Sequence, residues 1–275
     1  MPLKTTNPIT PSLRGTIRLK KSQLNPIFYI KKNILKQNKS GGRNNSGKIT
    51  VAHRGGGHKQ RYRNIQFNRK MESVGINTSI EYDPNRNCYI ASIYDFLKKS
   101  YFYIIAPKNL KVGSIVKSGH NAEAKIGHAL TISKIPVGSF IHCISVKSAQ
   151  KSKVSRSAGT FAILIEKTLK HARIQISSGE QRYLSVNCVA TIGSVSNEFF
   201  FLTTTGKAGR SRWNNNRPHV RGVAKNPIDH PHGGGEGKKS KKSPPVTPWG
   251  KSVKYKKTSR SKNKLIIKNS NNGSR

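Results

Sequence analysis

The chain has 275 residues, and its 52 Lys and Arg residues outnumber its 10 Asp and Glu residues to give a formal net charge of +42. Repulsion among so many cations opposes compaction, and a partner whose phosphates replace the lost counterions relieves it. A membrane fits this role less well than nucleic acid, because no apolar run approaches the roughly 20 residues of a transmembrane helix. We therefore expect a nucleic-acid-binding protein without a membrane partner.

The basic residues are concentrated at the two ends of the chain. Residues 1–71 hold 17 Lys and Arg and no acidic residue, and residues 206–275 hold 19 against only Asp229 and Glu236. Such segments contain too little apolar sequence to fold alone. We expect two basic extensions, over 1–71 and 206–275, that become ordered only on a partner.

The moderately charged middle of the chain is predicted to form short β-strands. Two sets of segments are rich in Ile, Tyr and Val, and the turn sequences Asp-Pro-Asn at 83–85 and Ser-Gly-Glu at 178–180 interrupt them. Short strands with hardly a helical period between them favour small barrels. We expect an all-β fold with one barrel over 72–133 and a second over 134–205. The predicted strands cover residues 74–83, 86–94, 101–106, 139–146, 160–166, 172–177 and 181–186.

The three cysteines Cys88, Cys143 and Cys188 lie far apart, each among apolar residues. None of them forms a CxxC pair with another, which is the spacing typical of zinc sites. We expect three small core residues in a reducing compartment, with neither a disulfide nor a zinc ion.

Segment 42–63 alternates basic side chains with glycines. Glycine lets backbone amides approach a phosphate closely, and arginine offers a planar pair of donors. His53 and His58 are separated by three glycines, which argues against a rigid metal pair. Tyr62 either stacks on an exposed base or packs against a barrel. The predicted phosphate contacts of this segment are Arg54, Lys59, Arg61 and Arg63.

A second glycine-rich loop, NPIDHPHGGGEGKKS at 226–240, contains Asp229, His230, His232 and Glu236. A metal site needs a third and a fourth ligand, and an acid–base pair needs a pocket that this segment has little apolar sequence to build. We favour a loop that lies between RNA strands, with its histidines bonded to phosphate or 2′-hydroxyl groups. Two alternatives stay open: a metal-dependent hydrolase that uses Asp229, His230 and His232, and an architectural DNA-binding protein that uses the extensions.

Six motifs occur in one order along nearly the whole chain. They are GRNNSGKITVAHRGGGHKQRYR (42–63), YDPNR (82–86), RSAGT (156–160), GKAGRSRW (206–213), RPHVRGVAKNPIDHPHGGGEG (217–237) and PVTPWG (245–250). Together they resemble the ribosomal protein L2 family, the universal uL2 of the large ribosomal subunit.

The resemblance implies an OB-like barrel followed by an SH3-like barrel, with long extensions that become ordered on large-subunit rRNA. It implies a structural constituent that supports subunit assembly and association and the architecture around the peptidyl transferase centre. The implied partners are large-subunit rRNA, neighbouring large-subunit proteins and the small subunit, with no small-molecule substrate. Peptidyl transfer is then expected of rRNA, and the protein is not an enzyme. No cofactor is expected beyond Mg²⁺ associated with rRNA.

The resemblance also carries over to particular residues. The family's RNA-binding face between the barrels matches Arg86 and Arg156; the alternative for each is a surface arginine that caps a turn or pairs with a carboxylate. The histidine of DHPHGG matches His230, which we expect to position the loop through a hydrogen bond to rRNA; proton transfer during peptide-bond formation is the alternative. Trp213 and Trp249 could stack on bases, although Trp249 could equally close its loop. The predicted rRNA contacts are Arg54, Lys59, Arg61, Arg63, Arg86, Arg156, Lys207, Arg210, Arg212, Trp213, Arg217, Arg221, His230, His232, Lys238 and Trp249.

Two stretches depart from the family pattern. DFLKKSYFYIIAP at 95–107 replaces a turn rich in glycine and charge, which casts doubt on strand pairing there. SVSNEFFFLTTTG at 194–206 is unusually apolar. We expect its phenylalanines to fill a gap beside the second barrel, and contact with a partner protein is the alternative.

The abundance of Lys, Asn and Ile is typical of AT-rich coding, and the family pattern begins almost at Met1. Residues 10–24 look closer to the α-proteobacterial and mitochondrial branch than to the plastid branch. We expect a mitochondrial ribosome, with a plastid or the bacterial cytoplasm as alternatives.

Overall fold

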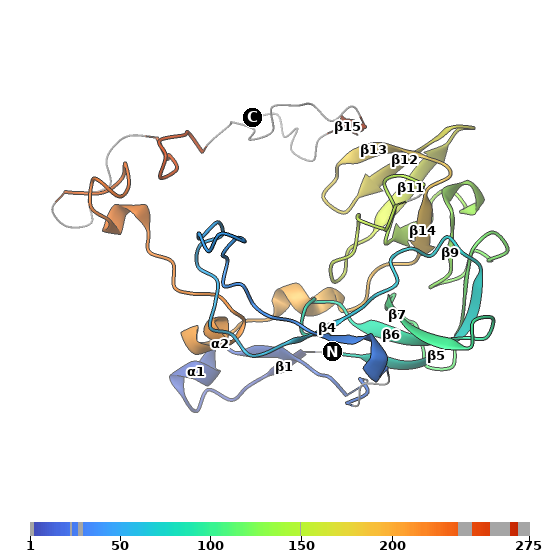
Figure 1. Ribbon diagram of the computed structural model, residues 1–275, viewed down its shortest axis with the longest axis horizontal. Helices are drawn as coiled ribbons and strands as arrows, with labels where there is room; N and C mark the ends of the chain where they lie inside the picture. The colour runs from blue at the N-terminus through green and yellow to red at the C-terminus, as the bar shows by residue number, and fades with distance from the viewer. Residues whose placement is uncertain are drawn as a thin grey trace. The chain divides into compact units, whose positions relative to one another are not determined.

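The computed structural model describes residues 3–22, 24–26, 30–148, 150–235, 244–253 and 265–268 (Figure 1). Strands predominate, and no helix in these ranges is long and apolar enough to cross a membrane. The strands are β1 (Leu3–Thr5), β2 (Ile17–Leu19), β3 (Ile34–Lys36), β4 (Arg61–Arg63), β5 (Ser73–Glu81), β6 (Ile90–Asp95), β7 (Ser100–Ile105), β8 (Ile115–Ser118), β9 (Ala129–Thr131), β10 (Phe140–His142), β11 (Ala162–Lys167), β12 (His171–Ile176), β13 (Gln181–Ser185), β14 (Val189–Ile192) and β15 (Ile266–Lys268). The helices are α1 (Pro11–Arg14) and α2 (Ala208–Trp213), and the 3₁₀ turns are η1 (Lys31–Asn33), η2 (Ile132–Lys134), η3 (Glu198–Leu202) and η4 (Gly222–Ala224).

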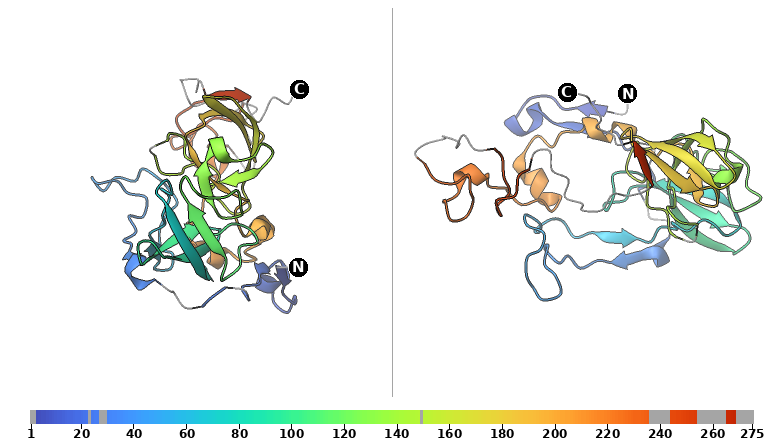
Figure 2. Two further views of the ribbon diagram at one scale, coloured as in Figure 1. Left: turned by 90° about the vertical axis from the view of Figure 1, so that its right-hand side faces the viewer. Right: turned by 90° about the horizontal axis from the view of Figure 1, so that it is seen from above.

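Eleven of these strands form one continuous sheet in the order β15-β13-β12-β11-β10-β14-β9-β8-β5-β6-β7. Neighbouring strands are antiparallel except β8 and β9, which meet in parallel where Ser118 pairs with Ala129. β15 lies beside β13 in both views of Figure 2, where it is drawn in red. Two further pairs, β1-β2 and β3-β4, lie outside this sheet.

The strands β5 to β8 form the first barrel-like half of the sheet. Side chains along β5 alternate between buried and partly exposed, as expected of a strand with one face on a core. β5, β6 and β7 lie side by side in Figure 1. β7 is the last strand of the sheet, and Ile65 forms an isolated β-bridge with its Tyr103. The core of this half contains Ala91, Ile93, Ile104, Ala106, Leu110 and Val116.

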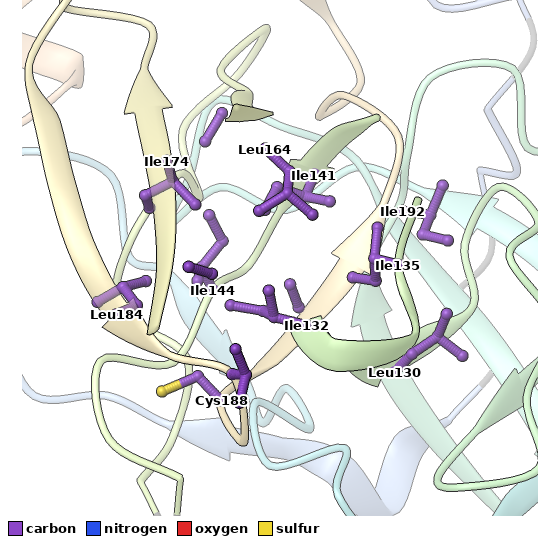
Figure 3. Packing of buried hydrophobic residues seen from close by; sticks show 14 residues of the cluster. Leu130, Ile132, Ile135, Ile141, Ile144, Leu164, Ile174, Leu184, Cys188 and Ile192 are labelled. Carbon is purple, nitrogen blue, oxygen red and sulfur yellow. The ribbon is translucent and has the colours of Figure 1, made fainter. Parts of the chain in front are cut away.

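The strands β9 to β14 enclose the second core. Figure 3 shows Leu130, Ile132, Ile141 and Ile174 among the side chains that gather there. β9 lies before the boundary at 133/134 that the sequence indicated, yet it pairs with β14 and its Leu130 is buried in the second core. The second barrel therefore begins near β9, and a strand of three residues is too short to show a period of two.

The structure confirms the all-β fold with two barrel-like halves, and all seven predicted strand segments contain a strand. β6 begins later than predicted, at Ile90, because residues 84–88 form turns and bends. The doubt about pairing at 95–107 was wrong, since β6 and β7 pair without a break from Ile90–Ile105 to Asp95–Ser100. The three cysteines are buried and free of disulfides.

The chain divides into two compact units. One comprises Met1–Asn38, Lys59–Lys207 and Lys264–Arg275, and the other comprises Lys39–His58 and Ala208–Asn263. Both barrels belong to the first unit. The second unit joins parts of the two basic extensions, which composition alone predicted to remain unfolded without a partner.

Candidate nucleic-acid interface

A groove of about 630 Å³ lies between the two barrels. The turn after β5 contributes Asn85, Arg86 and Asn87 to its wall, and the loop between β10 and β11 contributes Arg156. The structure thus brings Arg86 and Arg156 to one groove although they lie 70 positions apart in the sequence. The other lining residues are Tyr62, Phe67, Lys153, Ser155, Ser157, Thr160, Ile176 and Ser177.

Arg86 is held by a carboxylate. Its Nε lies 2.6 Å from Oδ2 of Asp83, whose side chain is fully buried. The other Asp83 oxygen, Oδ1, accepts the backbone N–H of Asn85 at 2.9 Å, and the Arg86 guanidinium carbon lies 5.8 Å from the centre of the Tyr62 ring. Arg86 therefore stabilises the 83–86 turn, as its alternative interpretation expected, and also lines the groove.

Arg156 is held differently. Its side chain is exposed, and no carboxylate of the described residues lies within 4.0 Å of its guanidinium nitrogens. The guanidinium carbon lies 4.9 Å from the centre of the Phe67 ring, a cation–π arrangement that orients the group without neutralising it. A planar cation of this kind can take a phosphate with two parallel hydrogen bonds.

Arg63 was predicted wrongly as a phosphate contact. Only 2% of its surface is exposed, and its Nη1 donates to the carbonyl of Arg61 at 2.9 Å. Exposure decreases along β4, from the exposed Arg61 through the partly exposed Tyr62 to the buried Arg63. Arg63 and the buried Glu81 both act on the pKa of Tyr103, which burial raises, so the arginine belongs to a buried polar cluster.

The glycines of segment 53–58 pack against the end of α2. The N–H of Gly55 donates to the carbonyl of Asn215 at 3.2 Å, and the N–H of His58 donates to the carbonyl of Trp213 at 3.1 Å. A Cβ on Gly57 would lie 2.6 Å from the backbone nitrogen of Asn215. These glycines allow a close approach of two backbones, so the amides of Gly55 and His58 are not free for a phosphate as the sequence suggested.

The remaining predicted contacts differ in exposure. Arg210 and Arg212 are partly buried in α2, Trp213 is about half exposed, and Trp249 is almost fully exposed in a turn closed from Gly250 to Thr247. Lys238 lies outside the described residues. The predicted contacts that are exposed are Arg54, Lys59, Arg61, Lys207, Arg217 and Arg221.

The loop around His230 is folded on itself. His230 is only 8% exposed, and its Nδ1 accepts the backbone N–H of His232 at 3.0 Å. Nε2 of His232 accepts the N–H of Val246 at 3.1 Å, and the two rings lie 4.8 Å apart. A Cβ on Gly222 would lie 2.7 Å from the His230 ring, so glycine is required at that position.

These contacts fix the chemistry of both histidines. A ring nitrogen that accepts an amide hydrogen carries no proton, and in the neutral ring the other nitrogen carries it. Burial and repulsion from Lys225 lower the pKa of His230 and favour the same neutral form. The lone pairs that could bind a metal are therefore occupied, and the described residues contain no group of three His, Cys, Asp or Glu suited to hold an ion. We predicted that His230 bonds to RNA; in the structure its ring nitrogen accepts a hydrogen bond from the backbone of the same loop.

Two further residues belong to the groove. Phe67 and Lys153 line it beside Arg156, and neither was predicted. Lys153 follows Lys151 just before the RSAGT motif, and this cluster of charge was the available signal. Phe67 had no such signal, because an isolated aromatic residue in sequence does not reveal which arginine lies above it.

Two barrels with a basic groove between them and basic segments beyond them define a nucleic-acid-binding protein of the all-β class. Residues 30–118 match the family model described as Ribosomal Proteins L2, RNA binding N-terminal domain, and residues 125–250 match Ribosomal Proteins L2, C-terminal domain. The chain belongs to the ribosomal protein L2 family.

Curated relatives agree with this assignment. The large ribosomal subunit protein uL2 of Rickettsia peacockii is 48% identical over 274 residues, which cover 98% of this chain and 99% of the relative. The uL2 protein of Granulibacter bethesdensis is 47% identical over 276 residues, which cover 99% and 100%. The similarity therefore includes both barrels and both extensions.

Proposed function

We propose that the chain is a structural protein of the large ribosomal subunit that binds large-subunit rRNA with the groove between its barrels and with its two extensions. The observation that carries this proposal is the meeting of Arg86 and Arg156 in one groove, with Arg156 exposed and free of any carboxylate within salt-bridge distance among the described residues. Membership of a family with an RNA-binding domain supports RNA over DNA as the ligand.

The protein holds RNA in place and performs no chemical step. Peptidyl transfer in this proposal belongs to rRNA, with Mg²⁺ supplied by the RNA itself. The loop 226–235 supports the architecture near the peptidyl transferase centre, because ring nitrogens of its two histidines accept backbone amide hydrogens of the chain and hold the loop together. Neighbouring large-subunit proteins and the small subunit are the further partners, through which the chain supports assembly and subunit association.

The compartment is a separate part of the proposal. The mitochondrial ribosome is supported by the Lys-, Asn- and Ile-rich composition and by the pattern of residues 10–24. The two relatives named above are bacterial, and this supports the alternative of the bacterial cytoplasm. Immunodetection across organelle and cytosol fractions, with ribosomes pelleted from each, decides between them.

RNA preference is tested with the full chain. Its affinity is measured for a large-subunit rRNA transcript and for duplex DNA of the same length at equal salt, because phosphate contacts make affinity dependent on salt. We expect at least about tenfold tighter binding to the rRNA near 0.2 M salt, since specific contacts add to the electrostatic ones. Equal affinities would favour the architectural DNA-binding alternative.

A further inference from the structure

Three aromatic rings gather on the hairpin of β6 and β7. Tyr94 and Tyr101 are direct partners across the two strands, and their ring centres lie 4.8 Å apart. The ring of Phe96 stands edge-on to that of Tyr94, with centres 5.7 Å apart. Phe96 and Tyr101 lie in the stretch 95–107, which departs from the family pattern, and Tyr94 immediately precedes it.

These rings are not part of the core. Phe96 is 50% exposed and Tyr101 is 40% exposed, whereas Tyr103, two positions further along β7, is fully buried. Residues two positions apart share a face of a strand, so Tyr101 lies on the same face of β7 as Tyr103 but nearer the hairpin turn, where exposure is higher. An exposed group of large apolar rings indicates a contact that the chain alone does not make.

The turn beside the rings is held by hydrogen bonds and is positively charged. Asp95 is buried, and its Oδ1 accepts the backbone N–H groups of Leu97 at 3.0 Å and Lys98 at 3.4 Å. The N–H of Phe96 donates to the carbonyl of Val74 at 2.9 Å and fixes that residue to β5. The carboxylate of the turn is thereby turned inward, while the side chains of Lys98 and Lys99 are exposed.

We propose that residues 94–101 form a stacking platform for unpaired bases of RNA. Phe96 and Tyr101 offer ring faces to the bases, and Lys98 and Lys99 take the flanking phosphates. Aromatic side chains on adjacent strands beside basic residues suit single-stranded RNA, whose unstacked bases every ring can accept. The charge of the turn favours this occupant over an apolar surface of a neighbouring protein. This inference rests on the proposed function, which already makes RNA the ligand.

The test uses the full chain and a single-stranded RNA of about twelve nucleotides with 2-aminopurine at its centre. Stacking quenches the fluorescence of this base, and high salt removes most of the non-specific phosphate contacts. We expect Phe96→Leu to weaken quenching and binding about tenfold, because leucine keeps the apolar area but loses the ring face. Phe96→Tyr should restore both.

Phe140→Leu is the matched control. Phe140 is similarly exposed and stands edge-on to Phe161, with ring centres 5.0 Å apart, but the turn that leads into its strand, residues 136–139, contains no lysine. This variant should bind and quench as the unchanged chain does. The double variant Lys98→Gln, Lys99→Gln should reduce the dependence of affinity on salt while keeping the quenching.

Unchanged binding and quenching by Phe96→Leu would overturn the platform and point to an apolar contact with a protein, for which leucine suffices. The same experiments include the large-subunit rRNA transcript as a second ligand. If the unchanged chain binds that transcript normally and the hairpin substitutions have no effect on binding or quenching, only the stacking platform is contradicted. Failure of the unchanged chain to bind the transcript removes the proposed function itself.

Discussion

Arg86 and Arg156 line the same groove but are held by opposite kinds of neighbour. Arg156 lies above an aromatic ring, and Arg86 compensates a buried carboxylate. We predict that Arg156→Ala lowers affinity for rRNA by about 1 to 3 kcal/mol, because it removes a charge-assisted contact. Its melting temperature should be unchanged. Filter binding and thermal unfolding of the same preparations measure the two effects.

Arg86→Ala should affect folding as well as binding. It leaves Asp83 buried without a cation, which costs about 3 kcal/mol of unfolding free energy. Arg173→Ala is the control, because Arg173 pairs with a partly exposed Glu166 at 3.5 Å and lies outside the groove lining. Equal loss of stability in Arg156→Ala and Arg86→Ala would contradict the difference between the two sites.

His142 should make the stability of the chain depend on pH. It is fully buried, its Nδ1 lies 2.9 Å from the carbonyl of Gly193, and burial lowers its pKa to about 4. The neutral ring is favoured in the folded state, so its contribution is complete above the ordinary pKa near 6.5 and is lost as pH falls toward 4. The loss amounts to about 3 kcal/mol.

Urea unfolding at pH 7.5, 5.5 and 4.5 checks this contribution. His142→Asn keeps a donor for Gly193 but does not titrate, so the difference in stability between pH 7.5 and 4.5 should shrink in this variant. His171→Gln changes an exposed histidine and serves as the control. An unaltered pH dependence in His142→Asn would show that other groups cause it.

At the scale of elements, the contact between segment 53–58 and α2 depends on a glycine. A Cβ on Gly57 would lie 2.6 to 2.8 Å from backbone atoms of Trp213 and Asn215. This clash could be relieved only by a shift of the backbone. We predict that Gly57→Ala separates the two segments and leaves the barrels folded. Limited proteolysis should then cut faster within 39–58, while the melting temperature of the barrels stays the same.

Gly209→Ala is the control for this experiment. Gly209 lies in α2 in a helical conformation, and a Cβ there would meet no atom within 4 Å. Alanine also favours the helix over glycine. Cleavage of both variants at the same rate would contradict the close approach at Gly57.

The longer strands were predictable from the sequence, and most of the shorter ones were not. β5, β7, β11, β12 and β13 were predicted because each is long enough to show apolar alternation or a flanking turn. β8, β9 and β14 were missed because strands of three or four residues lack a legible period, and all three pair with strands far away in sequence. The phenylalanines of η3 were predicted to fill a gap, yet Phe201 is 79% exposed.

Residues of the candidate site were predictable where they belong to a sequence motif. They were not predictable where burial of the side chain determines whether it can contact RNA. Arg86 and Arg156 followed from YDPNR and RSAGT, and the structure places both in one groove. Arg63 and His230 were taken as RNA contacts because of their residue type and glycine neighbours. Both are buried, Arg63 in the cluster that contains Glu81 and His230 beside Gly222, and a single sequence does not show how deep a residue of a short strand or loop lies.

At the scale of the whole molecule, charge determines how binding responds to salt. The two extensions carry 36 of the 52 basic residues. Each phosphate that they neutralise releases counterions, so affinity for rRNA should fall by more than about a thousandfold between 50 and 200 mM salt. Titrations at four salt concentrations give the slope. A nearly flat slope would mean that the extensions do not contact phosphate.

The most direct measurement is cryo-electron microscopy of large ribosomal subunits from the source organism. We predict density for both barrels, with rRNA in the groove between Arg86 and Arg156 and the 226–235 loop packed against RNA. Large subunits that lack the chain, or a groove that faces solvent or another protein, would contradict the claim that this groove binds rRNA.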